Sequence, residues 1–107
     1  MRALGVTTSV RSPITPEIPT IDEAGLPGYE MTTWYGLFAQ GATPRIVVAK
    51  LQRELARILD QADMKERIAA DGMTVVASTP EGFAQFLARE TVKYARIIET
   101  AGIKAID

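Results

Sequence analysis

The chain has 107 residues, of which 47% are apolar and 23% charged, a composition typical of one small globular domain. Its formal net charge of −1 offers no basic field for nucleic acid, and it contains neither cysteine nor histidine. These absences exclude Cys- or His-based nucleophilic catalysis and the usual zinc sites. The apolar runs are shorter than the roughly 20 residues of a membrane span, and no signal peptide is expected at the N-terminus.

The first quarter of the chain predicts a strand, a loop and a short helix. Leu4 and Val6 alternate with smaller residues in the segment 3–8, which indicates a buried strand with no earlier element to pair with. Three prolines between residues 12 and 19 predict an extended loop. Thr20 can then cap a short helix over residues 21–24.

The middle of the chain contains its most apolar and aromatic run. The sole tryptophan, Trp34, opens this run, and we predict a central strand that extends from Tyr29 to Phe38. Thr43 is the expected N-cap of the next helix, with Pro44 at its first position and its end near residue 59. The apolar face of that helix comprises Val47, Val48, Leu51, Leu55, Ile58 and Leu59.

The last third predicts two more helices with a strand between them. Asp63 is the expected cap of a helix over residues 64–70, and the β-branched run 73–77 predicts a strand near a sheet edge. The pair Thr79–Pro80 starts a long helix that runs to about residue 101. Its apolar stripe, residues 83–98, fits either a domain core or a seam for a partner helix. The order β-loop-α-β-β-α-α-β-α indicates an α/β fold.

Few residues form a constellation that could carry chemistry. Asp22, Glu23 and Glu30 could supply an acid/base pair, although acids in the first turn of a helix need no further reason. Trp34 and Tyr35 could wall a ligand pocket or pack in the core, and adjacent strand residues point to opposite faces. No phosphate-binding glycine fingerprint is present, so we predict no cofactor and no enzyme activity.

Several runs resemble one family. Residues 3–8 (Ala-Leu-Gly-Val-Thr-Thr), 25–30 (Gly-Leu-Pro-Gly-Tyr-Glu) and 34–39 (Trp-Tyr-Gly-Leu-Phe-Ala) are similar to the C-terminal third of Bug-type extracytoplasmic solute receptors. These receptors are the substrate-binding components of tripartite tricarboxylate transporters. The resemblance covers essentially the whole chain, with small departures at Gln40 and Gly82.

The resemblance implies part of a two-lobed Venus-flytrap fold of the type II periplasmic-binding-protein class. Residues 1–28 would be a remnant of the second lobe, residues 29–43 the crossover strand, and residues 44–107 the elements that complete the first lobe. The family's main ligand loops are expected outside this chain. Thr32, Trp34 and Tyr35, near the crossover, are the remaining candidates for ligand contact.

The function that the resemblance implies is binding of carboxylated small molecules for uptake. The expected partners are such a ligand and the membrane transporter subunits, both acting on the full-length receptor in the periplasm, with no nucleic acid. Alone, the chain should lack a full ligand site. The alternative is a self-associating module, a homodimer that exchanges segments to cover its open strand edges and apolar helix faces.

Overall fold

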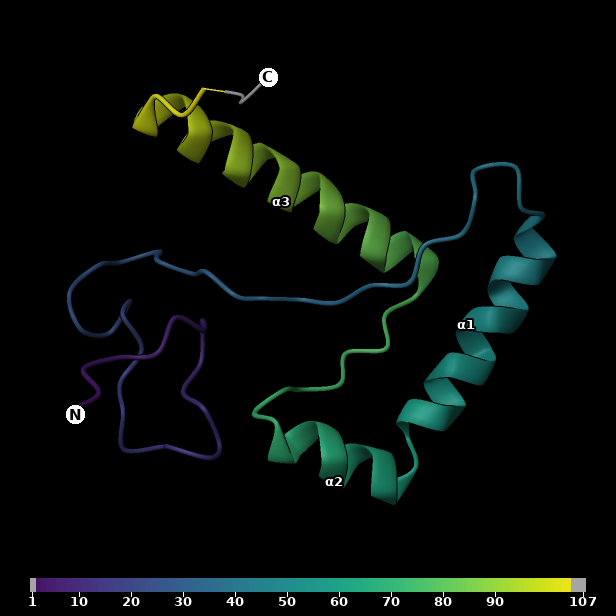
Figure 1. The fold of residues 1–107 in the computed structure, drawn as a ribbon, viewed down its shortest axis with the longest axis horizontal. Helices are drawn as coiled ribbons and strands as arrows, with labels where there is room; N and C mark the ends of the chain where they lie inside the picture. Colours follow the sequence, from purple (N-terminus) through teal and green to yellow (C-terminus); the bar gives the residue numbers. More distant parts are fainter. Residues whose placement is uncertain (1, 105–107) are drawn as a thin grey trace.

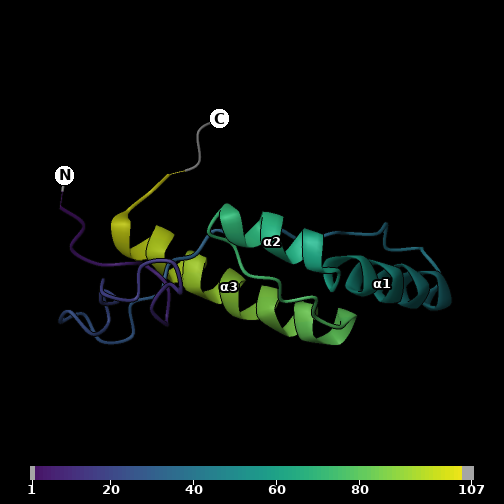
Figure 2. The same cartoon turned by 90° about the horizontal axis from the view of Figure 1, so that it is seen from below.

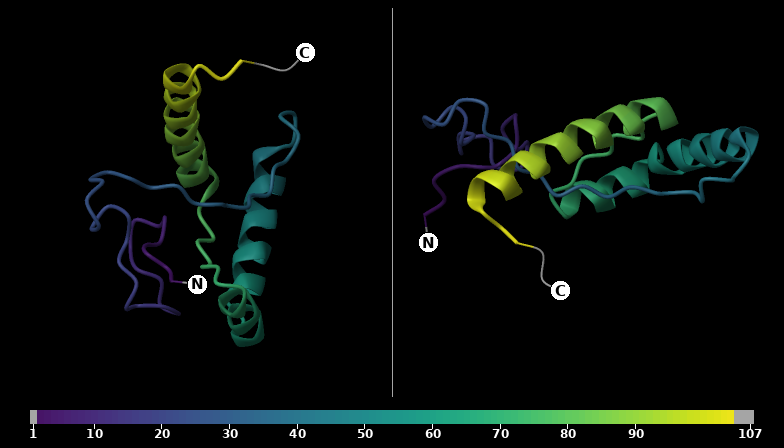
Figure 3. Two further views of the ribbon diagram at one scale, coloured as in Figure 1. Left: turned by 60° about the vertical axis from the view of Figure 1, so that its left-hand side comes forward. Right: turned by 90° about the horizontal axis from the view of Figure 1, so that it is seen from above.

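The computed structural model describes residues 2–104 and contains three helices. They are α1 (Arg45–Leu59), α2 (Ala62–Ala70) and α3 (Pro80–Ala101), shown in Figure 1. The rest of the described chain is turns and extended segments. Figures 2 and 3 show α3 on one side and α1 with α2 on the other, joined by the segment that follows α2.

The start of α3 follows the sequence prediction closely. Thr79 is the N-cap, its side-chain hydroxyl accepts a hydrogen bond from the Gly82 N–H at 3.1 Å, and Pro80 occupies the first turn. This arrangement satisfies one of the N–H groups that have no partner within the helix.

The end of α3 is also as predicted. Gly102 takes the left-handed conformation with φ of 64°, and the Ile103 N–H donates to the Ile98 carbonyl at 3.0 Å. With the bond from the Gly102 N–H to the Glu99 carbonyl, this is the Schellman pattern that closes a helix.

The two other helices begin one or two residues away from the predicted positions. In α1 the cap is Pro44 rather than Thr43, with no side-chain cap bond, because Pro44 has an extended ψ of 137° and leaves the helix to begin at Arg45. In α2 the cap is Gln61, and Asp63 lies inside the first turn. Since the Gln61 carbonyl already accepts from the Lys65 N–H, the helix starts before Asp63 could cap it.

The predictions of strands and of a short helix over residues 21–24 are wrong. Residues 2–104 contain no β-strand, and a single parallel bridge joins Val6 to Thr20. The segment 21–24 is a turn. No backbone hydrogen bond joins residues 34–38 or 74–77 to another segment within the described part. These runs are extended but lack a neighbour, and a strand exists only where a ladder of inter-strand bonds forms.

The described chain is far more open than a folded domain of its size. Its accessible surface is 9161 Å², whereas a compact monomer of 11.6 kDa is expected to expose about 5,800 Å². The radius of gyration is 17.1 Å, against about 13 Å for a compact chain of this length. No apolar side chain among the described residues is fully buried, so the expected burial of residues 3–8 is also wrong, with Leu4 75% exposed.

Candidate functional site

An aromatic cluster packs the extended segment 34–38 against α3. The ring of Trp34 meets Phe86 edge-on at 5.2 Å between centroids and Phe83 at 5.8 Å. Phe38 contacts Phe83 at 5.3 Å, and the rings of Phe83 and Phe86 are stacked at 6.2 Å. Edge-to-face and offset arrangements are the favoured geometries for aromatic pairs. Trp34 therefore packs against a helix and is half-buried.

The segment 34–38 has the side-chain alternation of a strand even without a ladder. Trp34, Gly36 and Phe38 face α3, where Gly36 lies against the Phe83 ring. Tyr35 and Leu37 face the other way and are 82% and 75% exposed. This confirms the expectation that Trp34 and Tyr35 point to opposite faces.

The three predicted ligand-contact residues are not brought together. Thr32 is half-buried, Trp34 packs on α3, and Tyr35 projects into solvent on the opposite face. Because Trp34 and Tyr35 lie on opposite faces of one extended segment, at most one of the two can face a given cleft. Their role in ligand contact therefore stays a prediction.

An ion pair on α3 between a buried Glu90 and a half-buried Lys93 is the feature that sequence reasoning missed. Glu90 is 9% exposed, and its Oε1 accepts a hydrogen bond from the Lys93 ammonium at 2.5 Å. That bond raises the pKa of Lys93, and the nearby Glu30 carboxylate acts in the same direction. The Oε2 atom of Glu90 is buried without a partner. The i, i+3 spacing of an acid and a lysine was the available signal, but burial could not be read from it.

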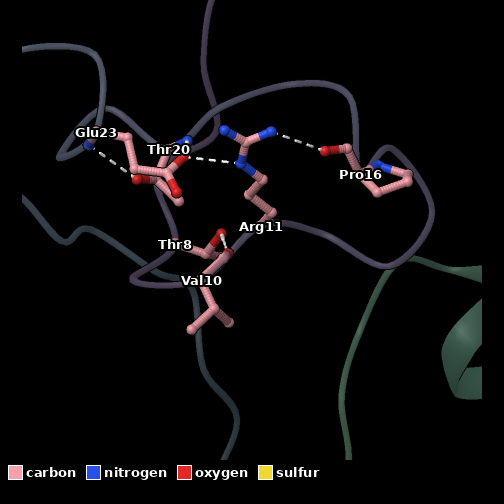
Figure 4. Close-up of polar contacts among 6 residues, drawn as sticks. All are labelled: Thr8, Val10, Arg11, Pro16, Thr20 and Glu23. Atoms are coloured by element: carbon pink, nitrogen blue, oxygen red, sulfur yellow. Dashed lines mark hydrogen bonds and ion pairs between the residues drawn. The ribbon is translucent and has the colours of Figure 1, made fainter.

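Two of the three acids in the predicted carboxylate group, Asp22 and Glu23, each have a structural partner. Thr20, which is 1% exposed, and Glu23 form a reciprocal capping box: the Thr20 N–H donates to Glu23 Oε2 at 3.0 Å, and the Glu23 N–H donates to Thr20 Oγ1 at 3.1 Å. Arg11 joins them, pairing with Glu23 at 2.8 Å and donating to the Pro16 carbonyl at 3.2 Å (Figure 4).

The hydrogen bond from the Thr20 backbone lowers the pKa of the Glu23 carboxyl below its ordinary value of 4.5, and the Arg11 guanidinium adds to the effect. Asp22 accepts a hydrogen bond from the Gly28 N–H at 2.5 Å, across the following turn. This arrangement fits turn stabilisation rather than an acid/base pair, since both carboxylates are occupied by local donors.

The surface hollows are shallow and lie along single helices. One groove runs along α3, lined by Ala88, Arg89, Val92, Lys93, Arg96 and Ile97, and another along α1, lined by Ile46, Val47, Lys50, Leu51 and Glu54. Within residues 2–104, no group of three or more acidic, His or Cys side chains is placed to hold a metal ion. The helices of that same range include none with the length and apolar content of a membrane span.

Comparison with known proteins places the chain in a family. Residues 1–103 match the family model described as the tripartite tricarboxylate transporter family receptor, TctC. The chain is 41% identical over 99 residues to a UPF0065 protein of Pseudomonas sp. strain P51, covering 92% of this chain and 30% of the relative. It is 33% identical over 105 residues to Protein BugT of Bordetella pertussis, with 97% and 32% covered. The chain belongs to the TctC receptor family.

Solved structures agree with this assignment. R. palustris Rpa4515, solved with adipate, matches with a TM-score of 0.81 and 30% identity over 96% of this chain and 34% of that one. The periplasmic binding protein BugD matches with a TM-score of 0.79 and 31% identity, over 94% and 34%. The described residues thus have part of a binding-protein fold, and the chain spans about a third of the length of these relatives.

Proposed function

We propose that this chain forms the C-terminal third of a periplasmic receptor that binds carboxylated small molecules for tripartite tricarboxylate uptake. The observation that carries the proposal is the likeness to the adipate-bound R. palustris protein, which extends over 96% of this chain. In this proposal, residues 1–28 belong to the second lobe, residues 29–43 cross between lobes, and residues 44–107 complete the first lobe. The ligand and the membrane transporter subunits are partners of the complete receptor.

The chain alone is proposed to lack a working ligand site. Among residues 2–104, the two helix grooves have mixed apolar and charged linings, and Trp34 and Tyr35 lie on opposite faces of one segment. In that part of the chain, these features give no convergent set of donors for a carboxylate. Binding of small ligands requires a concave site with a few polar groups aimed at one place. A binding role of the complete receptor, rather than an enzymatic one, is proposed because the matching family model describes a receptor.

Titration calorimetry of the isolated chain tests whether it lacks a working ligand site. We expect no heat of binding for adipate, citrate, malate, glutamate or nicotinate. This result corresponds to a Kd above about 1 mM for each acid. A micromolar Kd for any of these acids would show that the chain holds a complete site. Acetamide, a neutral compound, serves as the control for non-specific heats.

A second function is favoured by one observation, the exposure of large apolar side chains. Tyr35, Leu37, Ile46 and Val76 are each at least 75% exposed, and patches of this kind mark interaction surfaces or aggregation sites. In this alternative the chain is a self-associating module that exchanges segments with a second copy and binds no small molecule. A stable monomer by light scattering at high concentration would count against it.

A further inference from the structure

Ala77 adopts a backbone conformation that its side chain disfavours. Its φ is 45°, and the other positive φ values within residues 2–104 belong to glycines, as at Gly72. In the left-handed region the Cβ of an alanine comes close to the following carbonyl oxygen, a contact that a glycine avoids. Strain of this kind persists only where the surrounding structure imposes it.

The local sequence explains why the strain falls on Ala77. The preceding residues 74–76, Thr-Val-Val, are β-branched and favour extended backbone. On the other side, Pro80 keeps the residue before it out of the helical region, and Thr79 is extended with a ψ of 160° while it caps α3. The change of direction into α3 is therefore left to Ala77 and Ser78, which have the smallest side chains of this stretch.

A side chain of α1 ties this turn to the rest of the structure. The Gln52 Nε2 donates a hydrogen bond to the Ser78 carbonyl at 3.4 Å, and Gln52 is half-buried. No backbone hydrogen bond joins residues 74–78 to another segment within the described part of the chain. A distance of 3.4 Å is at the weak end of the range for hydrogen bonds. The turn is thus held by a contact that can be released.

The start of α3 carries the segment 34–38 with it. The rings of Trp34 and Phe38 pack on Phe83 and Phe86, which lie in the first two turns of the helix. The helices α1 and α2 lie on the other side of the structure and lead into α3 through the segment that contains Ala77 (Figure 2). A change of φ at Ala77 would therefore turn α3 and the segment 34–38 together relative to α1.

We propose that Ala77 is a strained joint and that Gln52 is the positioning residue that keeps it in the left-handed conformation. When the Gln52 bond is lost, Ala77 relaxes to a negative φ, and α3 turns relative to α1 with the segment 34–38 still packed on it. Two separate observations carry the proposal, the φ of Ala77 and the bond from α1 to the next residue. The joint is a property of this chain and does not depend on the ligand class proposed above.

Spin-label distances between α1 and α3 test the joint. The chain has no cysteine, so Lys50→Cys on α1 and Gln85→Cys on α3 give two exposed and unique label positions. Gln52→Ala should shift the mean label distance by more than the width of the distribution measured with Gln52 present. In the same variant the carbon-13 shifts of Ala77 Cα and Cβ should leave the left-handed range. If either the distance or the Ala77 shifts stay unchanged, the proposal is overturned.

The matched control is Gln40→Ala, which removes an exposed glutamine outside the helices and should leave both measurements unchanged. The Trp34 emission and the helix content by circular dichroism should also stay the same in Gln52→Ala, because the aromatic cluster moves with α3. A red shift of the Trp34 emission together with the distance change would mean that the contact between the segment 34–38 and α3 has loosened, and it would contradict a joint.

Substitutions at Ala77 test whether strain drives the change. Glycine adopts the left-handed conformation without steric cost. With Ala77→Gly in place, Gln52→Ala should therefore shift the label distance less than it does with Ala77. Ala77→Val should give the shifted distance even with Gln52 present, because a β-branched residue tolerates a positive φ less well than alanine. Equal responses to Gln52→Ala with alanine and glycine, or an unshifted distance in Ala77→Val, would show that no strain is stored there.

Discussion

Gly36 lies directly against the ring of Phe83, so closely that a methyl group at residue 36 would overlap the ring. Gly36 has an ordinary backbone conformation, and it is the close approach of the segment 34–38 to α3 that requires a glycine. The contact lies between the two rings, Trp34 and Phe38, that also face Phe83. Packing of the segment 34–38 against α3 thus depends on the absence of a side chain at residue 36.

Gly36→Ala should therefore weaken the packing of the segment 34–38 against α3. We expect a cost of about 1–3 kcal/mol, since either the ring or the segment must move to accept the methyl group. A red shift of the Trp34 emission would report the movement. Gly41→Ala is the control, because no atom lies within 4 Å of a Cβ there, and an equal shift in both variants would contradict the prediction.

Phe86→Ala should expose Trp34 to water. The two rings meet at 5.2 Å, and loss of one member of an aromatic pair removes its area and about 0.5–1.5 kcal/mol of specific interaction. The sole tryptophan gives the readout, as increased quenching of its fluorescence by acrylamide. Tyr35→Ala, at a side chain 82% exposed, should leave the quenching as it is.

Thr20→Val should loosen the turn that follows the proline-rich loop. Thr20 Oγ1 accepts from the Glu23 N–H at 3.1 Å, and loss of such a cap typically costs about 1 kcal/mol. Amide hydrogen exchange at Glu23 measures the effect and should become faster. Thr20→Ser retains the hydroxyl and should keep the protection, so equal exchange in both variants would argue against the capping box.

The Glu23 carboxyl should titrate below 4.5. The backbone N–H of Thr20 and, to a lesser extent, Arg11 stabilise its ionised form. Because its pKa is lowered on folding, this group stabilises the turn above the ordinary pKa, and the contribution is lost as the pH falls through the lowered value. Carbon-13 NMR titration measures the pKa of the Glu23 carboxyl. Arg11→Ala should raise the pKa only partly, since the Thr20 donor remains.

Lys93→Met should leave the Glu90 carboxylate without its counter-ion in a site that is 9% exposed. We expect a loss of about 2 kcal/mol, and Glu90→Gln combined with Lys93→Met should recover part of it because no charge is then stranded. Urea unfolding of the helices, followed by circular dichroism, gives both values. Equal stability of the single and double variants would contradict a stranded charge.

The same ion pair has a predictable response to alkali. The pKa of Lys93 is raised above its ordinary value of 10.5 by the hydrogen bond to Glu90. A group whose pKa rises on folding stabilises the folded state at pH values below its ordinary pKa. This stabilisation disappears as the pH rises through the raised pKa. The free energy of unfolding should therefore not change around neutral pH because of Lys93. The contribution of the ion pair to that free energy should be lost only in strong alkali.

The parts that sequence predicted well are governed by local chemistry. Thr79 with Pro80 at the start of α3, and Gly102 with Ile103 at its end, are each specified by a few neighbouring residues. The family also followed from short runs of residues, and the match over residues 1–103 confirms it. In contrast, the buried setting of Glu90 gave no signal, because it depends on which segment covers that face of α3.

By itself the sequence determined the positions of α1, α2 and α3 to within two residues, both ends of α3, the alternation of residues 34–38 and the receptor family, because each of these depends on neighbours within a few positions or on a family pattern. Only the tertiary structure decided that the predicted strands stay unpaired and that Trp34 packs on α3 while Tyr35 faces solvent. The physical reason is that a strand, unlike a helix, obtains its hydrogen bonds from a distant segment. Where the described chain offers no such segment, the extended run is present and the sheet is not.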